Sequence, residues 1–273
     1  MASKNKLQKI LLSPVTFPLV PHSKQVSNSD IADSVALARK TSDDHEWKRI
    51  YCSHCGAHHD IPVYCGNRFC EVCARGRRMR TRDRLRWIIA QVQPAAPYHI
   101  NFLTLTVGNM KSAQAQCRKL LKSFRKLRQR AEWKKHVRGG AFVLEVKKGT
   151  LGWHVHIHAV IESRFWKWES ILTLWHRCSG GTGCFIKQIP HAKAVGYLTK
   201  YLSKASVSDG DLIAVLDSLK GLRLFNPFGT WYNLNKTYPK KTFVCPVCGV
   251  SDWIWEGRWD KMVEWYGPPP QIE

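Results

Sequence analysis

The chain has 273 residues, with 43 Lys and Arg against 20 Asp and Glu, and a formal net charge of +23. This length accommodates one catalytic domain and a smaller appendage, and so basic a surface indicates a polyanionic partner, nucleic acid before an anionic membrane. No apolar run approaches the length of a membrane span, and residues 1–21 lack the apolar segment and cleavage site of a signal peptide. We therefore expect a cytoplasmic protein that binds nucleic acid and no membrane.

The first part of the chain divides into a leader and a cysteine-rich segment. Residues 1–44 mix polar residues and Pro without a sustained period and are predicted to be an irregular leader. Residues 45–95 follow as a predicted zinc-binding and DNA-binding segment, because they contain two Cys-x-x-Cys knuckles. In a long basic chain such pairs favour metal in a reducing compartment over disulfides.

The four knuckle cysteines, Cys52, Cys55, Cys70 and Cys73, are predicted to form one closed tetrahedral zinc site. Such a site would stabilise a segment too short to hold a core of its own. Cys65 lies between the knuckles and either replaces one of the four or stands free.

A short helix is predicted after the second knuckle; it ends at Trp87 and is rich in arginine. A run of like charge is usually a solvated face. Here seven arginines accompany one acid, Asp83, and they would repel one another unless phosphates neutralised them. We therefore predict a DNA-facing helix braced by zinc, with four candidate contacts: Arg75, Arg77, Arg78 and Arg80.

Residues 101–107 alternate and are rich in β-branched and aromatic types, which predicts a strand. Residues 112–136 predict a helix with an apolar stripe and a basic outer surface, from which Lys122 and Arg125 are candidate DNA contacts. Gly139 and Gly140 are expected to separate this helix from the next strand.

That next strand, residues 141–146, has Glu145 as its only acid. A carboxylate among apolar strand residues is costly to bury unless it is paired, so a cation is expected close by. Further along, residues 166–177 predict a helix and residues 184–189 another strand.

The segment Trp-His-Val-His-Ile-His-Ala-Val-Ile, residues 153–161, is a predicted strand with two different faces. Alternation puts His154, His156 and His158 on one side and apolar residues on the other. Any single histidine would most often meet solvent or a backbone partner, but three alternate imidazoles backed by an apolar face favour a metal.

A short turn at residues 149–152 makes the two strands antiparallel neighbours and brings Glu145 beside His156 and His158. One carboxylate and two imidazoles leave positions open for substrate oxygens. Oxygen ligands from a phosphodiester would complete the site, and we expect Mg or Mn as the working ion.

Residues 191–205 predict a helix on which Tyr197 and Tyr201 lie about 40° apart, among lysines and opposite the leucines. Tyrosines that fill a core would lie with the leucines. Two phenols about one turn apart, flanked by ammonium groups, are what a nucleophile for a phosphodiester requires. Lys200 and Lys204 would hold phosphate or favour the ionised phenol.

Three segments resemble, in order and spacing, the three motifs of the HUH endonucleases that initiate rolling-circle replication. The segments are Phe102-Leu-Thr-Leu-Thr106, His156-Ile-His-Ala-Val-Ile161 and Tyr197-Leu-Thr-Lys-Tyr-Leu-Ser-Lys204. The paired tyrosines are most similar to the two-tyrosine branch of microvirus and plasmid initiators. The resemblance covers residues 100–205, and the knuckle segment resembles the cysteine-rich region of plasmid initiators.

The resemblance implies a metal-assisted nick at a single-stranded or hairpin origin. A tyrosine becomes joined to the 5′ phosphate and the freed 3′ hydroxyl primes synthesis, while the second phenol attacks after a full round. Tyr201 is the expected nucleophile and Tyr197 its partner, although some plasmid relatives have a glutamate in place of Tyr197. A host helicase, a DNA polymerase and a single-strand-binding protein in a prokaryotic cytoplasm are the implied partners.

Residues 206–273 are expected to form a C-terminal module. Trp231, Tyr232, Tyr238 and Phe243 predict strands or a base-stacking surface, or else a small aromatic core around Cys245 and Cys248. This third Cys-x-x-Cys supplies half of a second zinc site, which Cys178, Cys184 or the N-terminal cysteines would complete.

We thus predict an α+β fold with a central antiparallel sheet and flanking helices, of the HUH or ferredoxin-like kind, over residues 96–205, preceded by the zinc segment. The expected function is a rolling-circle initiator. The alternatives are an HUH transposase or relaxase with the same chemistry, and a non-catalytic zinc-dependent DNA-binding regulator.

Overall fold

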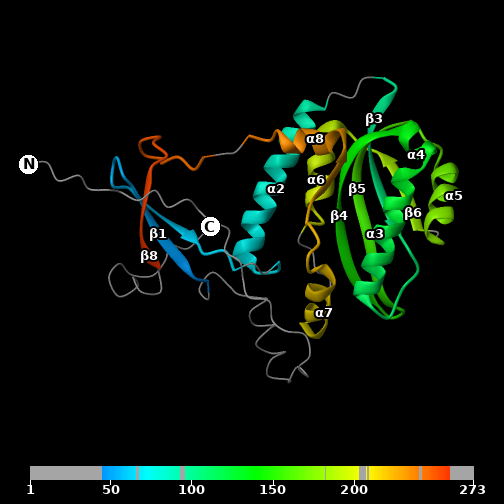
Figure 1. Ribbon diagram of the computed structural model, residues 1–273, viewed down its shortest axis with the longest axis horizontal. Helices are drawn as coiled ribbons and strands as arrows, with labels where there is room; N and C mark the ends of the chain where they lie inside the picture. Colours follow the sequence, from blue (N-terminus) through cyan, green and yellow to red (C-terminus); the bar gives the residue numbers. More distant parts are fainter. Residues whose placement is uncertain are drawn as a thin grey trace, which may run out of the picture.

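The computed structural model describes residues 45–65, 68–92, 96–181, 183–202, 207, 209–239 and 242–258. The predicted leader, residues 1–44, and the candidate phosphate ligand Lys204 lie outside the described part. The described residues form an α+β fold with a three-stranded and a five-stranded sheet (Figure 1).

The elements follow one another as β1 (Trp47–Cys52), β2 (His58–Pro62), α2 (Glu71–Gln91), β3 (Tyr98–Thr106), α3 (Ala113–Gln129), α4 (Ala131–His136), β4 (Val137–Gly149), β5 (Gly152–Arg164), α5 (Trp168–Ser179), β6 (Gly183–Gln188), the 3₁₀ helix η1 (His191–Lys193), α6 (Ala194–Thr199), α7 (Asp209–Leu219), β7 (Asn226–Gly229), α8 (Thr230–Lys236) and β8 (Trp253–Arg258).

The large sheet has the strand order β6-β3-β5-β4-β7, and all of its neighbours are antiparallel. The predicted β4–β5 hairpin is confirmed: Gly149 pairs with Gly152, and Glu145 pairs with His156. Gly152 has φ +105°, a value that favours glycine and lets the chain reverse at this turn.

Helices cover both faces of the large sheet. On one face α3, α5 and α7 bury strand residues such as Leu103 and Ile157. On the other, which we call the histidine face because it carries His154, His156 and His158, residues such as Phe102 and Val160 pack against α2, α6 and α8. Figure 1 shows α2 and α6 on one side of the sheet and α3 and α5 on the other.

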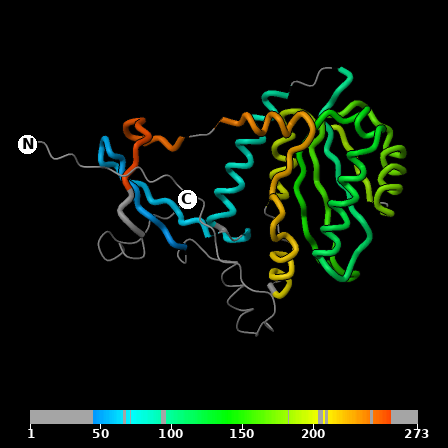
Figure 2. The backbone as a smooth tube through the Cα atoms, in the orientation of Figure 1, coloured from blue at the N-terminus to red at the C-terminus, as the bar shows by residue number. Residues whose placement is uncertain are grey.

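The small sheet has the order β2-β1-β8, so its two edge strands come from opposite ends of the described chain. Figure 2 shows the blue N-terminal hairpin beside the orange-red C-terminal strand. The expected C-terminal module, residues 206–273, is therefore divided: β7 and α8 join the large sheet and its covering helices, and β8 joins the small sheet.

Three local expectations differ from the structure. Trp231 and Tyr232, expected in a strand, a base-stacking surface or a small aromatic core near Cys245, lie in α8, because the indole of Trp231 fills the core of the histidine face. The glycine pair before residue 141 lies inside β4, where a side chain at Gly140 would collide with the Val160 carbonyl. The long helix of residues 112–136 breaks at Arg130, which is extended, and Trp133 then packs edge-on against Phe124.

In the described part of the chain, none of the helices combines the length and the apolar character that crossing a membrane demands.

Candidate functional site

A carboxylate, an imidazole and a phenol meet on the histidine face. The Nε2 atom of His158 donates a hydrogen bond to Oε2 of Glu145 at 2.9 Å. The ring of Tyr201 stacks on the ring of His158, with 3.7 Å between centroids and 16° between planes. Glu145 is 1% exposed and His158 5%. The structure therefore brings together residues from β4, β5 and the turn after α6.

The three histidines of β5 form a row of stacked rings. The centroids of His154 and His156 lie 4.3 Å apart, and those of His156 and His158 lie 5.6 Å apart. Burial, followed by repulsion from the two neighbouring imidazoles, lowers the pKa of His156 to about 4. At neutral pH this ring is thus uncharged and keeps a lone pair for a ligand.

Glu145 is ionised despite its burial. Burial alone would raise its pKa, but the hydrogen bonds from His158 and Lys147 outweigh burial and leave the pKa below its ordinary value. Nζ of Lys147 lies 3.2 Å from Oε2 of Glu145. A negative charge is therefore fixed at the centre of this face, which is the condition for holding a cation.

The end of α6 explains why Tyr201 reaches the histidines. The helix predicted for residues 191–205 is shorter, and the amide groups of Tyr201 and Leu202 bond to carbonyls three residues back, at 3.2 Å each. In such 3₁₀ geometry side chains three apart eclipse, so Tyr201 turns toward the side of the buried Leu198 and faces the sheet.

Tyr197 lies on the same face but contacts a different ring. Its centroid is 5.2 Å from that of Phe102, which also lies 6.1 Å from Tyr201. Both phenol side chains are half-buried against this core. Lys200 is exposed, with Nζ 5.9 Å from the centroid of the Tyr201 ring.

The residues around Glu145 suit a cation in their donor atoms. Oε1 of Glu145, Nδ1 of His156 and Nε2 of His154 are buried, and none of them has a hydrogen-bond partner in the described structure. The predicted triad of Glu145, His156 and His158 is not among the described groups whose donor atoms all lie within 4.8 Å of one another. Two of its three members are in contact, and His156 stands one ring further along the row.

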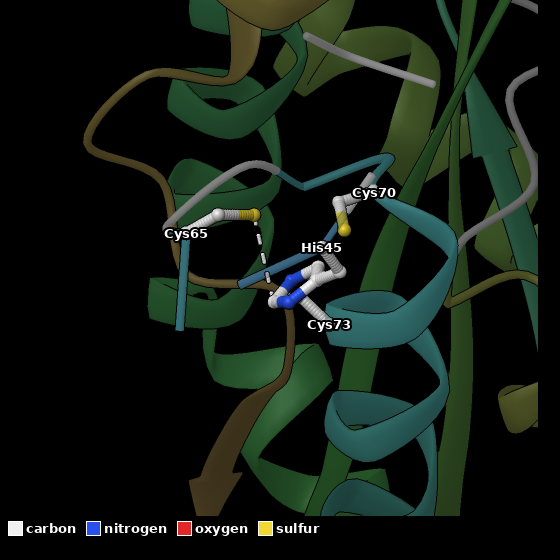
Figure 3. Close-up of side chains that lie close together, drawn as sticks. All are labelled: His45, Cys65, Cys70 and Cys73. Atoms are coloured by element: carbon white, nitrogen blue, oxygen red, sulfur yellow. Dashed lines mark hydrogen bonds between the residues drawn. The ribbon is translucent and has the colours of Figure 1, made fainter. Parts of the chain in front are cut away.

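The cysteines form two groups whose membership differs from the predicted site of Cys52, Cys55, Cys70 and Cys73 and the predicted half-site of Cys245 and Cys248. The first is His45, Cys65, Cys70 and Cys73, and the second is Cys52, Cys55, Cys245 and Cys248. In each group all donor atoms lie within 4.8 Å of one another. Figure 3 shows the first group gathered at the start of α2.

The prediction that both N-terminal knuckles share one site is therefore wrong, and the β1–β2 hairpin is the reason. One knuckle, Cys52 and Cys55, lies at the hairpin's turn, while His45 and Cys65 flank its open end. Strand rise separates the two ends by roughly 17 Å. The antiparallel pairing of β8 with β1 brings the third knuckle, Cys245 and Cys248, to this turn. The N-terminal cysteines Cys52 and Cys55 therefore complete its group, and Cys178 and Cys184 do not.

The distances within the two groups fit a tetrahedral metal. The sulfurs of Cys52 and Cys248 are 3.5 Å apart and those of Cys55 and Cys245 are 3.6 Å apart, too long for a disulfide. In the first group Nε2 of His45 lies 3.2 Å from the sulfur of Cys73. Metal–sulfur bonds of about 2.3 Å give a tetrahedron edge of about 3.8 Å. Both groups could hold an ion such as zinc.

In the second group the thiolate is favoured at Cys52, whereas the pKa values of Cys55 and Cys248 are raised. The backbone amide of Cys55, opposed by burial, is the main cause that lowers the pKa of Cys52 to about 6. A thiolate at neutral pH is the form in which cysteine binds a metal.

The predicted DNA-binding residues lie on two sides of the large sheet. Arg75, Arg78 and Arg80 are exposed on α2, whose later residues pack on the histidine face, and Arg77 donates to the hydroxyl of Tyr64 at 2.7 Å. Lys122 and Arg125 are exposed on α3, which covers the opposite face. The arginine helix therefore shares a side with the tyrosines, and the α3 pair does not.

Sequence reasoning missed three residues that complete these sites. Thr104 holds His158, with Oγ1 3.1 Å from Nδ1, and its place opposite His158 follows from the alternation of β3. Lys147 lies two residues after Glu145 in β4, so alternation along the strand places it on the same face, where it pairs with Glu145. His45 precedes β1 and gave no local signal, because its partners are distant in the chain.

Residues 59–173 match the family model Rep_1, described as replication protein. The comparisons with curated proteins and with solved structures give no match. The matched segment contains α2, Glu145 and all three histidines of β5, and it ends before Tyr197. Over this segment the chain is thus similar to the Rep_1 replication proteins, a match consistent with a rolling-circle initiator.

Proposed function

We propose that the protein initiates rolling-circle replication by nicking one DNA strand and joining it to a tyrosine. The observation that carries the proposal is the stack of the Tyr201 ring on His158, whose Nε2 bonds to the buried Glu145. A phenol thus lies beside the candidate cation-binding residues, where a single phosphate can contact both. The Rep_1 match supports the role in replication.

Glu145, His156 and His158 would hold the cation, and their carboxylate oxygen and imidazole nitrogens suit Mg or Mn. When bound, the ion supplies positive charge at the scissile phosphate. Thr104 fixes the ring orientation of His158 through Nδ1, as residues behind metal-binding histidines commonly do.

In the reaction itself, the phenolic oxygen of Tyr201 attacks the phosphorus and the bond to the 3′ oxygen breaks. The phenol loses its proton to solvent, and the departing 3′ oxygen gains one. The products are a 5′-phosphotyrosine and a free 3′ hydroxyl, so the number of phosphodiester bonds is unchanged. Tyr197 then attacks the regenerated site after one round, and reversal of the step closes the displaced circle. Lys200 and Lys204 bind flanking phosphates.

DNA is brought to this face by α2. Its exposed arginines are on the side of the tyrosines, and the group of His45, Cys65, Cys70 and Cys73 orients its first turn. We take zinc as the ion of both cysteine groups. A single-stranded or hairpin origin is the proposed substrate, followed by a host helicase, polymerase and single-strand-binding protein in a prokaryotic cytoplasm.

The test is covalent trapping. Protein is incubated with 5′- and 3′-labelled single-stranded DNA from a replication origin, with Mg, Mn or EDTA, and adducts are resolved on denaturing gels. The wild type should form an adduct only with metal. Tyr201→Phe should reduce the initial adduct by about 1,000-fold or more. Tyr197→Phe should retain the first cleavage and lose the second transfer.

A matched pair of carboxylates controls for folding. Glu145→Gln should reduce adduct formation by about 100-fold or more. Glu162→Gln alters another buried carboxylate of the same face, 3.5 Å from Arg138 and remote from the histidines in β5, and should nick normally. Absence of any adduct from the wild type, with DNA binding intact, would favour the non-catalytic regulator. Nicking without repeated transfer would favour a transposase or relaxase.

A further inference from the structure

An exposed aromatic ring stands on the histidine face at the edge strand β6. Phe185 pairs with Thr104, which pairs in turn with His158. Directly opposed residues of antiparallel strands point to the same face, so these three side chains form one row across the sheet. Two strand spacings separate Phe185 from His158, roughly 10 Å.

The exposure of Phe185 has no explanation in the packing. Its side chain is 52% exposed, while its neighbours Cys184 and Ile186 pack on the opposite face against the core. Tyr197 and Tyr201 each contact the ring of Phe102 on the histidine face, and Phe185 has no such ring contact among the described residues. Exposed apolar side chains are common on protein surfaces, but this ring lies in one row with Thr104 and His158, where it can contact a ligand bound at the candidate site.

The positive charge around the Phe185 ring indicates which kind of ligand would bind there. Lys187 is exposed on the same side of β6, two residues along, and Lys193 and Lys200 are exposed on the segment that follows. The only carboxylates in strands β3–β7 are Glu145 and Glu162, and both are buried. A ligand with both planar apolar groups and negative charge fits this surface, and a single strand of DNA has both.

We propose that Phe185 stacks on a base of the single strand beside the scissile phosphate, and that Lys187 contacts an adjacent backbone phosphate. The inference rests on the proposed function for its substrate. It adds the residue that holds an unpaired base in place, which distinguishes single-stranded from duplex DNA because a base inside a duplex has no free face for the ring.

Two probes of equal charge separate stacking from phosphate binding. One is fluorescein-labelled oligothymidylate of 12 nucleotides, and the other is a 12-unit abasic strand with the same phosphates. Anisotropy titrations with full-length protein should show that Phe185→Ala weakens binding of the thymidylate about fivefold to 100-fold and leaves the abasic strand unchanged. Lys187→Ala should weaken both and reduce the salt dependence by about one ion.

Three variants guard against misfolding. Phe185→Trp should keep the preference for bases, and Phe185→Leu should lose it while it keeps an apolar side chain. Phe165→Ala removes an exposed ring that lines a hollow with Asn101 and Ile186 on the opposite side of the sheet, and it should bind both probes as the wild type does.

The inference is overturned if Phe185→Ala binds both probes like the wild type, or if the wild type binds thymidylate no better than the abasic strand. Its fate is separate from that of the nicking reaction. Loss of the base preference in Phe185→Ala without any phosphotyrosine adduct in the wild type would sink the proposed function alone. Adduct formation with unchanged binding by Phe185→Ala would sink the stacking alone.

Discussion

The two sheets of this protein are held together in different ways. The large sheet is buried on both faces, and both hydrophobic clusters of the described residues belong to it and its helices. The small sheet buries few apolar side chains, among them Trp47 and Ile50, and an ion pair of Arg49 with Asp60 at 2.7 Å. Its ends instead carry the two groups of cysteine and histidine ligands. Metal ions held by these groups would take the place of a core, because the sheet is too small to form one.

Removal of metal should have the largest effect of all, and this effect should be confined to the small sheet. We predict two zinc ions per chain, with Cys73→Ala losing one and Cys245→Ala losing the other, because the two groups share no ligand. Structural zinc contributes about 10–16 kcal/mol to folding, so the small sheet should unfold while the large sheet stays folded. Zinc release assays and amide NMR spectra measure both.

Cys184→Ser is the control, since Cys184 belongs to neither group, and it should keep both ions. The double variant Cys52→Ala with Cys73→Ala discriminates the pairing. It should lose both ions, whereas a single four-thiolate site would lose only one.

Truncating a core side chain of the large sheet should have a smaller effect: it should lower the stability of the large sheet and leave zinc binding by the small sheet unchanged. Trp231 is fully buried on the histidine face, and Trp231→Ala should lower the free energy of unfolding by about 3–5 kcal/mol. Zinc content should remain at two ions. Tyr232→Ala, next in α8 and exposed, should change the urea midpoint little. Loss of zinc from Trp231→Ala would show that the two sheets do not fold independently.

The smallest predicted effect concerns pH and is confined to the large sheet. Because burial lowers the pKa of His156 to about 4, the unfolded chain binds a proton there from about pH 6.5 downward while the folded chain does not. Stability therefore falls between about pH 6.5 and 4. In metal-free protein, His156→Gln should lose less stability over this range, by about 1–2 kcal/mol after allowance for solvent screening of the half-buried ring.

Urea unfolding at several pH values, monitored by NMR signals of the large sheet, measures this difference. Above pH 7 the wild type and His156→Gln should stay a constant amount apart. Parallel curves down to pH 4 would contradict the prediction.

Local patterns in the sequence were enough to predict the strands at the centre of the large sheet and their pairing. Strict alternation in β5 fixed the histidine face, and the short turn at Gly152 fixed the register that places Glu145 opposite His156. Tyr201 was expected at this face from the charge around it, but its orientation toward His158 depends on the 3₁₀ turn, which a regular helical wheel does not contain.

Pairing across the chain could not be predicted in the same way. The four ligands at the hairpin turn join Cys52 to Cys248 across 196 positions, and equal Cys-x-x-Cys spacing makes any two knuckles suitable partners. Strand pairing of β8 with β1 decides between them. Trp231 was misassigned for a related reason, since an aromatic residue is equally compatible with a strand and with a buried helix until its neighbours are known.

The pairing of β8 with β1 has a consequence for biosynthesis. A ribosome adds about 5–20 residues per second, so the 190 positions between Cys55 and Cys245 take about 10–40 s to translate. During that interval the nascent chain can assemble β3 to β7. The thiols of Cys52 and Cys55 at the hairpin turn still lack Cys245 and Cys248, which have not yet been translated. A newly made molecule would therefore form its large sheet before its second cysteine group could hold an ion.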